Sequence, residues 1–201
     1  GARLDLYRIK PALLRRLEPV LARLERAGVS PDALTLGAIP VAGVAGIAVL
    51  ASPSVPLVLL LVPIAAGVRI LLNLLDGALA RRTGRSHARG ELYNEVGDRS
   101  ADVLMLAPVA FVPGVDARTV LIGVILAVLS SFVSVATKAA GGTRTYRGIL
   151  SKPGRMALLS VFAVAVVILG PAAWPPFGPL LVIGTATTFA ERLWFSVREL
   201  R

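Results

Sequence analysis

The chain has 201 residues, 55% of them hydrophobic, and carries a formal net charge of +10 with no cysteine. Ordinary soluble domains are less apolar, and apolar stretches of 18 or more residues recur here, so we expect one membrane domain. The absence of cysteine excludes disulfides, thiolate metal sites and cysteine nucleophiles. The basic residues alternate with apolar stretches and form no RNA-binding or DNA-binding motif, so a membrane explains the charge better than nucleic acid does.

The first 30 residues are charged and amphipathic. Residues 6–27 (LYRIKPALLRRLEPVLARLERA) place apolar side chains at helical spacing among many cations. This pattern is typical of a helix that lies on an anionic membrane surface, and a soluble helix docked on the rest of the protein is the alternative. The stretch GARLDLYRIK lacks the apolar core of a signal peptide, so we expect no cleaved signal. Residues 1–30 are therefore predicted to form a cytoplasmic interfacial helix.

The remaining residues, 31–201, are predicted to form one transmembrane domain. Hydropathy and helix breakers divide it into six spans. The predicted fold is an all-α integral membrane protein with six transmembrane helices behind the interfacial helix. The spans cover residues 32–50, 55–80, 90–111, 119–139, 155–170 and 177–195.

The distribution of Lys and Arg predicts the orientation. Of the 22 basic residues, 19 lie in the N-terminal segment, in residues 81–89, in residues 138–155 and near the C-terminus. These four regions share one side of the membrane if six spans alternate, and only Arg118 falls in a loop on the other side. Because basic loops stay in the cytoplasm, we expect a multi-pass protein of the cytoplasmic (inner) membrane with both termini inside.

A polar stretch, NLLDGALARRTGRSHARGELYNEVGD, interrupts the apolar chain at residues 73–98. Acidic residues at membrane depth are costly and by default mark function. At 3.6 residues per turn, its polar and small residues form one stripe on each of two antiparallel helices. The stripes consist of Asn73, Asp76, Gly77 and Ala80 on the second span and Glu91, Asn94, Glu95, Asp98 and Asp102 on the third.

The facing stripes predict a site for a hard cation and a phosphate group. Carboxylate and amide oxygens suit Mg²⁺ or Mn²⁺, and Arg81 would add a guanidinium group that matches phosphate oxygens. Gly77 and Gly90 would let a bulky substrate approach the backbone. The structural alternative is a set of buried ion pairs such as Asp98 with Arg69. We expect no ligand role for His87.

The stretch resembles the signature of the CDP-alcohol phosphotransferases, D-x2-D-G-x2-A-R-x8-G-x3-D-x3-D. The spacing matches throughout, and SPDALTL (residues 30–36) is similar to the family's Pro-Asn-x-x-Thr element, with Asp32 in place of Asn. The matching positions of the signature are Asn73, Asp76, Gly77, Ala80, Arg81, Gly90, Asn94 and Asp98.

Two positions depart from the signature. The first and third aspartates are replaced by Asn73 and Asn94, which are the only asparagines in the chain. An amide carbonyl can ligate a hard cation but carries no charge, so Asp76 and Asp98 alone balance one divalent ion. Either the site holds a single metal, or Glu95 restores part of the charge. We interpret the site as altered but working.

The resemblance implies a reaction and a role for each residue. A CDP-linked donor would bind with its pyrophosphate on one or two Mg²⁺ or Mn²⁺ ions, an acceptor hydroxyl would attack, and CMP would leave. Asp98 would be the general base. The resemblance also implies a homodimer. The implied metal ligands are Asn73, Asp76, Asn94, Glu95 and Asp98, and the implied CDP-binding residues are Thr35, Gly77, Ala80, Arg81 and Gly90.

A second basic stretch, TRTYRGILSKPGR, precedes the fifth span at residues 143–155. Its four cations could bind the phosphate of a polar acceptor or of a lipid headgroup, although positive-inside topology alone also explains such residues. The candidate acceptor-binding residues are Arg144, Arg147, Lys152 and Arg155.

The leading functional hypothesis is a membrane phosphatidyltransferase of phospholipid synthesis that uses CDP-diacylglycerol, with a water-soluble CDP-alcohol as the alternative donor. A divalent-cation transporter is a second hypothesis, but the outer halves of the spans lack the polar residues that a conducting path needs. A third is a CDP-lipid-binding protein without catalysis, which the two asparagines suggest.

Overall fold

The computed structural model describes residues 6–201, with side chains from residue 11 onward, and residues 1–5 of the predicted interfacial segment lie outside it. The described residues contain helices and no strand, so the predicted all-α class is confirmed. The α-helices are α1 (Leu6–Arg16), α2 (Glu18–Arg26), α3 (Pro31–Ala51), α4 (Leu61–Thr83), α5 (Ala88–Leu106), α6 (Ala117–Ala139), α7 (Lys152–Leu169) and α8 (Phe177–Glu199). Three short 3₁₀ helices, η1 (Pro56–Leu60), η2 (Ala107–Phe111) and η3 (Pro171–Ala173), lie in the connections.

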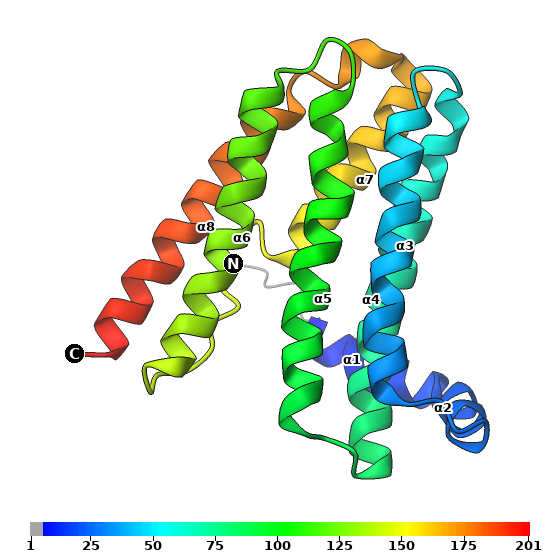
Figure 1. The fold of residues 1–201 in the computed structure, drawn as a ribbon, viewed down its shortest axis with the longest axis vertical. Helices are drawn as coiled ribbons and strands as arrows, with labels where there is room; N and C mark the ends of the chain where they lie inside the picture. The colour runs from blue at the N-terminus through cyan, green and yellow to red at the C-terminus, as the bar shows by residue number, and fades with distance from the viewer. Residues whose placement is uncertain (1–5) are drawn as a thin grey trace.

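The six long helices run up and down as a bundle (Figure 1). The α3–α4, α5–α6 and α7–α8 connections lie at one end, and the α4–α5 and α6–α7 loops lie at the other. Helices α1 and α2 lie near this second end, where α2 packs against α4. The residues around the predicted site therefore gather at the end that also carries the C-terminus.

Local sequence signals mark the ends of the helices around the site. Ser30 caps α3 by accepting a hydrogen bond from the backbone N–H of Ala33 at 3.1 Å, and Pro31 follows at the first helical position, where its missing N–H costs nothing. Gly84 ends α4 in the left-handed conformation with φ of 65°, which glycine adopts without strain. His87 then begins α5 as its N-cap. The polar stretch thus forms two helix ends and a tight loop.

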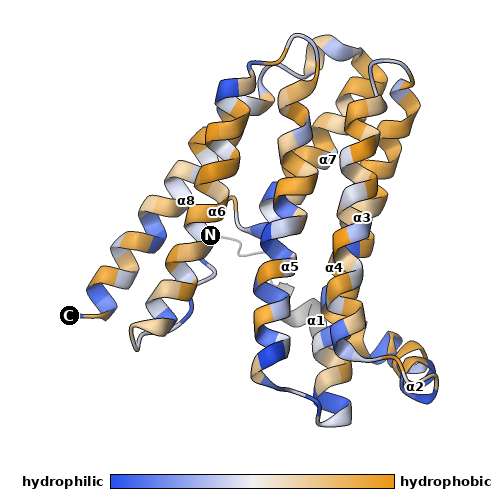
Figure 2. Cartoon of the chain, in the orientation of Figure 1, coloured by the Kyte–Doolittle hydropathy of each residue, from blue (hydrophilic) through white to orange (hydrophobic). Residues whose placement is uncertain are grey.

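Among residues 6–201, four helical segments are long and apolar enough to cross a membrane by length and composition. They are Pro31–Ala51, Pro56–Thr83, Ala117–Ala139 and Lys152–Leu169. Helices α5 and α8 are as long but carry charged residues. In Figure 2 the hydrophilic residues concentrate in the lower part of α5 and at the lower ends of the other helices, and the opposite end is mostly hydrophobic. The six-span count stays a prediction.

The interfacial segment differs in detail from the predicted single helix over residues 6–27. The structure forms two helices, α1 and α2, with Leu17 between them. Pro19 occupies the first turn of α2, where its ring and its missing N–H are tolerated, whereas inside one continuous helix they would cost about 3 kcal/mol. The break at Leu17 lies directly before this turn, although Pro11 inside α1 and Pro40 inside α3 interrupt neither of those helices.

The packing divides the bundle into two parts. Helix α3 packs against α4 and α5, and α7 packs against α4, whereas α6 pairs mainly with α8 (Figure 1). Gly46 lets α3 approach α5, because a Cβ atom there would collide with the backbone oxygen of Leu104. The acidic stripe of α5 consequently lies between α3, α4 and α7 on one side and the α6–α8 pair on the other.

Candidate active site

Two neighbouring cavities open at the polar end of the bundle. The first, of about 960 Å³, lies between the beginning of α3, the end of α4 and the beginning of α5. It brings together most of the predicted CDP-binding and metal-binding residues. These are Thr35, Asn73, Asp76, Gly77, Ala80, Arg81, Gly90 and Asn94.

Asp76 lies at the inner wall of the first cavity with 9% of its surface exposed. The Thr35 hydroxyl donates a hydrogen bond to Asp76 Oδ2 at 2.8 Å. Thr35 Oγ1 also lies 3.1 Å from the carbonyl oxygen of Pro31, one turn earlier in α3. Thr35 thus fixes the carboxylate across the α3–α4 contact. Within the described residues, no basic side chain lies within 4.0 Å of Asp76.

Two glycines line the first cavity, and neighbouring side chains lie close to both of them. A Cβ atom on Gly77 would lie 3.3 Å from Arg81 Nη1, so the Arg81 guanidinium group occupies the space next to Gly77. A Cβ atom on Gly90 would lie 3.3 Å from both Asp32 Oδ1 and the His87 ring. A side chain at either glycine would therefore be crowded by these neighbours, and the role of Gly77 and Gly90 in admitting a bulky donor stays a prediction.

His87 lines the first cavity but acts as a helix cap. Its Nδ1 accepts a hydrogen bond from the Gly90 N–H at 2.8 Å, and its Nε2 lies 3.6 Å from Asp32 Oδ2. These contacts account for the histidine as a helix cap, and the absence of a ligand role for it stays a prediction.

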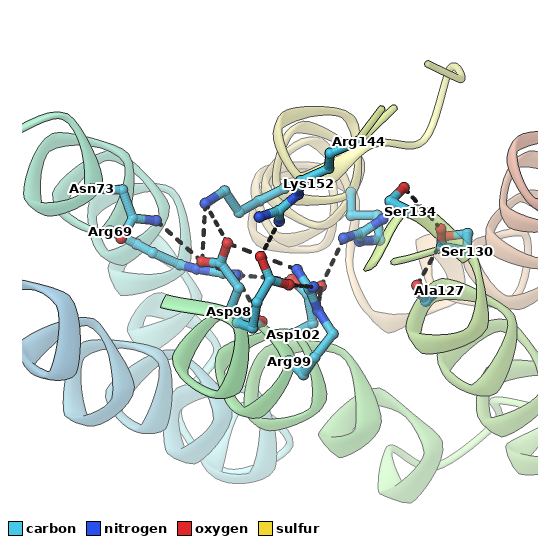
Figure 3. Close-up of polar contacts among 12 residues, drawn as sticks. Arg69, Asn73, Asp98, Arg99, Asp102, Ala127, Ser130, Ser134, Arg144 and Lys152 are labelled. Atoms are coloured by element: carbon cyan, nitrogen blue, oxygen red, sulfur yellow. Dashed lines mark hydrogen bonds and ion pairs between the residues drawn. The ribbon is translucent and has the colours of Figure 1, made fainter. Parts of the chain in front are cut away.

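Asp98 lies deeper on α5 and is held from two sides (Figure 3). Lys152 Nζ, at the beginning of α7, lies 2.9 Å from Asp98 Oδ1 and 2.8 Å from Oδ2. Asn73 Nδ2 on α4 donates to Oδ1 at 3.3 Å, and Arg69 Nη2 donates to the backbone oxygen of Asp98 at 3.0 Å. The ion-pair alternative is thus partly realised, since Arg69 Nη2 also lies 3.6 Å from Asp98 Oδ1.

A second polar layer lies one helical turn further in. Asp102, with 1% of its surface exposed, accepts hydrogen bonds from Arg69 Nη1 at 2.9 Å and from Arg155 Nη2 at 2.7 Å. Both arginines are also buried. Asn73–Asp98–Lys152 and Arg69–Asp102–Arg155 are therefore parallel layers, and each joins α4, α5 and α7. Asn73, Asp98 and Lys152 of the outer layer line the cavities, and Arg155 of the inner layer also lines the second one.

The second cavity, of about 370 Å³, lies between α5, α6, α8 and the loop before α7. It shares Asn94, Tyr146 and Lys152 with the first cavity. The predicted acceptor residues Arg144, Lys152 and Arg155 line it, together with Asp98. Further lining residues that the sequence analysis did not select are Arg99, Ser131, Ser134 and Arg192.

Arg192 is the main addition to the predicted site. It is 4% exposed, and its guanidinium group donates to the carbonyls of Arg147 and Ser130 at 2.7 and 2.9 Å and to Ser134 Oγ at 3.2 Å. No acidic side chain within the described residues lies within 4.0 Å of it. An arginine in an otherwise apolar helix was the available signal, but near the C-terminus it was counted as a topology charge.

Two predicted residues lie outside these arrangements. The Glu95 carboxylate pairs with Arg144 and, at 3.0 Å, with Arg99, and it does not line the first cavity. Arg147 stacks over the Phe195 ring at 4.1 Å and lines neither of the two cavities. Their roles as metal ligand and acceptor contact remain predictions.

The donor set suits a hard divalent cation. Asp76, Asp98, Asn73 and Asn94 all carry oxygen atoms, which Mg²⁺ and Mn²⁺ prefer. Within the part of the chain that the structure describes, no group of three or more acidic or histidine side chains converges. The residues present therefore fit a cation bound by few carboxylates, supplemented by amide oxygens and ligand phosphates.

Comparison with known proteins identifies the family. The chain matches no protein-family model. It is 30% identical over 165 residues to inner membrane protein YnbA of Escherichia coli strain K12, and the match covers 82% of each chain. It is 33% identical over 199 residues to phosphatidylinositol phosphate synthase of Mycobacterium marinum, which covers 92% of this chain and 81% of that enzyme. The chain belongs to the CDP-alcohol phosphotransferase family.

Solved structures share the CDP-alcohol phosphotransferase fold seen here. Mycobacterium tuberculosis phosphatidylinositol phosphate synthase (PgsA1) with CDP-DAG bound has a TM-score of 0.74 and 22% identity, over 90% of this chain and 94% of that one. The same enzyme with manganese and citrate has a TM-score of 0.75 and 20% identity, over 89% and 88% of the two chains. The predicted family resemblance is confirmed, and the chain is a membrane protein of a transferase family of phospholipid synthesis.

Proposed function

We propose that the protein is a phosphatidyltransferase that moves the phosphatidyl group of CDP-diacylglycerol to an alcohol acceptor and releases CMP. The observation that carries this proposal is the pair of adjoining cavities. The first is lined by seven of the eight signature residues, the second by the eighth, Asp98, and by several cations. Asn94 and Lys152 border both cavities. A donor in the first cavity would present its phosphorus to an acceptor in the second.

The reaction forms one bond and breaks one. The acceptor oxygen bonds to the phosphorus of the phosphatidyl group, the bond from that phosphorus to the CMP oxygen breaks, and the hydroxyl proton goes to Asp98. Asp98 borders the second cavity, where a general base within hydrogen-bond reach of the acceptor is needed. Arg81 would bind the pyrophosphate next to Gly77, and a divalent cation would neutralise charge on the leaving CMP.

The charges of the second cavity favour an acceptor that itself carries a phosphate. Arg144, Lys152, Arg155 and Arg192 line this space, and of these Arg192 has no acidic partner among the described residues. Guanidinium groups bind phosphate oxygens in bidentate geometry. A phosphorylated polyol would offer phosphate oxygens to these cations, which serine or an uncharged polyol would not.

The placement in the membrane is part of the proposal. Residues 1–30 would lie on the cytoplasmic surface, residues 31–201 would cross the inner membrane six times, and the active site and both termini would face the cytoplasm. The name of the Escherichia coli relative, inner membrane protein, supports this location. A homodimer is proposed from the family resemblance.

The test is CMP release by the purified protein with CDP-diacylglycerol and Mg²⁺ or Mn²⁺. The acceptor panel pairs glycerol 3-phosphate and an inositol phosphate with glycerol, inositol and serine. We expect CMP only with a phosphorylated acceptor, and none with EDTA or in the Asp98→Asn variant. CDP-diacylglycerol binding without CMP for any acceptor would contradict catalysis and support the non-catalytic hypothesis.

A further inference from the structure

The carboxylates around the two cavities differ in whether a protein cation already neutralises them. Asp32 lies near His87 and Arg89, and Glu91 pairs with Lys138. Glu95 and Asp98 also have basic partners. Among the described residues that line these cavities, Asp76 is the carboxylate without such a partner. An added cation would therefore gain the most electrostatic stabilisation at Asp76.

Lys152 occupies the position of a cation at Asp98. Its ammonium group contacts both carboxylate oxygens, at 2.8 and 2.9 Å, which leaves a metal little access to this carboxylate. Only 26% of the Lys152 side chain and 7% of the Asp98 side chain are exposed, so the ion pair is screened far less than one on the surface.

The backbone of Lys152 is fixed by the inner layer. Arg155, three residues later in α7, is bound to Asp102 and also donates to the carbonyl of Leu150 at 2.8 Å. The Leu150 N–H in turn donates to Thr188 Oγ1 on α8 at 3.1 Å. The first turn of α7 is thus attached to α5 and α8, which keeps the base of the Lys152 side chain opposite Asp98.

Asn73 also presents a hydrogen-bond donor, and not a metal ligand, to Asp98. Its amide N–H group points at Asp98 Oδ1 at 3.3 Å, as a hydrogen-bond donor does to an anion. A metal ion between these groups would need two oxygen atoms facing it instead. With asparagine at positions 73 and 94, Asp76 and Asp98 are the two carboxylates of the signature, and one of them is paired with Lys152.

We propose that the site binds one divalent cation, at Asp76, and that Lys152 supplies the second positive charge of the site, at Asp98. This inference rests on the proposed function and deepens it, because it separates the two signature carboxylates into a metal ligand and a lysine-paired residue beside the acceptor cavity. Lys152 is then a built-in cation and not only a phosphate contact.

The test counts Mn²⁺ ions by electron paramagnetic resonance in the purified, substrate-free full chain. We expect one ion per chain. Asp76→Asn should weaken its binding by more than about 100-fold, beyond the loss typical of an outer partner, whereas Asp98→Asn should change it by less than about tenfold. Thermal unfolding of each variant verifies that it is folded. Asp76→Glu, which keeps the charge, should retain binding if Asp76→Asn fails to fold.

A second variant tests the lysine directly. The double substitution Lys152→Gln with Asn73→Asp removes the ammonium group and adds a carboxylate, so it should take up a second Mn²⁺ ion. Two ions in the unsubstituted protein, no ion at all, or equal losses in Asp76→Asn and Asp98→Asn would each overturn the inference.

The outcomes separate the inference from the proposed function. One ion bound at Asp76, with no CMP release from any acceptor, would contradict the transferase proposal but agree with the single-cation inference. CMP release together with two bound ions in the unsubstituted protein would do the reverse.

Discussion

At the scale of single residues, Thr35 connects the beginning of α3 to the signature on α4. Replacing it with Val keeps the shape but removes the hydrogen bond to Asp76. Because partners that orient a metal ligand typically matter by about 10- to 100-fold, we expect Thr35→Val to weaken Mn²⁺ binding by a factor in that range. Thr35→Ser keeps the hydroxyl group and should stay close to the unsubstituted protein. Equal binding in the Val and Ser variants would show that the hydroxyl does not orient Asp76.

The sequence predicted the signature residues of the site better than its surroundings. Spacing at 3.6 residues per turn was enough to place Asn73, Asp76 and Gly77 on one face, because helix geometry is regular. Arg192 belongs to α8, more than 90 residues further along the chain, and its approach to Ser134 depends on how α6 and α8 pair. No local sequence pattern encodes this contact between α6 and α8, so the role of Arg192 could be recognised only from the structure.

Glu95 shows a second limit of prediction from the sequence, this time within the signature itself. Its neighbour Asn94 faces the first cavity, and a carboxylate next to it was a reasonable replacement for a missing aspartate. One residue is about 100° of helix rotation, however, and this turns Glu95 toward Arg99 and Arg144. The rotation, and not the residue type, determines which cation it meets.

At the scale of helices, Asp102 joins α4, α5 and α7 through two buried arginines. Asp102→Asn would leave Arg69 and Arg155 buried without their shared counter-charge. Breaking a buried ion pair from one side typically costs about 3–5 kcal/mol, so we expect a large loss of stability in detergent, measured by thermal unfolding.

The control for this variant is Asp116→Asn. Asp116 is exposed and caps α6 by accepting from the backbone N–H of Arg118 at 3.1 Å, and the hydrogen bond from the Thr119 hydroxyl lowers the pKa of its carboxyl group. Asparagine caps helices about as well as aspartate, so Asp116→Asn should unfold near the temperature of the unsubstituted protein. Similar losses in both variants would contradict a specific role for the buried layer.

Two glycines of α3 test how closely this helix approaches α5. Gly46→Ala places a methyl group against the backbone oxygen of Leu104, and overpacking of this kind costs about 1–3 kcal/mol. Gly43, one turn earlier, has no atom within 4 Å of a built Cβ, so Gly43→Ala should be neutral or stabilise by about 0.5–1 kcal/mol through helix propensity. Unfolding of the two variants in the same detergent gives the comparison. Equal stability of both would mean that α3 and α5 pack less closely than the structure has them.

Helix boundaries show where amphipathic patterning loses precision. The pattern over residues 6–27 correctly predicted helical structure, but it is continuous across Leu17, so the break into α1 and α2 was missed. Pro19 was present in the sequence as a possible signal. Proline is tolerated in a first helical turn and disruptive in the interior, and apolar periodicity alone does not distinguish these two positions.

At the scale of the whole molecule, the proposed topology can be tested because the chain has no cysteine of its own. Ser54→Cys lies in the α3–α4 connection and Ser86→Cys in the α4–α5 loop, and both serines are exposed. A membrane-impermeant maleimide added to intact cells should label the cysteine at 54 and not the one at 86. After the membrane is opened, both should react. Labelling of both positions in intact cells would contradict the placement of α4 as a span.

Helix α5 has a consequence for how the protein is made. In the proposed arrangement it enters the membrane with Asp98, Arg99 and Asp102, and each charge at mid-membrane costs about 2.5–3.5 kcal/mol on insertion scales. Its charged partners include Arg69 on α4, which emerges from the ribosome earlier, and Arg99 on α5 itself, which lies 3.7 Å from Asp98 Oδ2 and 3.9 Å from Asp102 Oδ2. Lys152 and Arg155 on α7 emerge about 50 residues later and form the shorter ion pairs, at 2.8 and 2.7 Å. The full set of ion pairs of α5 therefore forms only once α7 is in place, so the order of synthesis differs from the order of assembly. A nascent chain truncated before α7 would lack these two ion pairs, which makes α5 a natural target for membrane quality control.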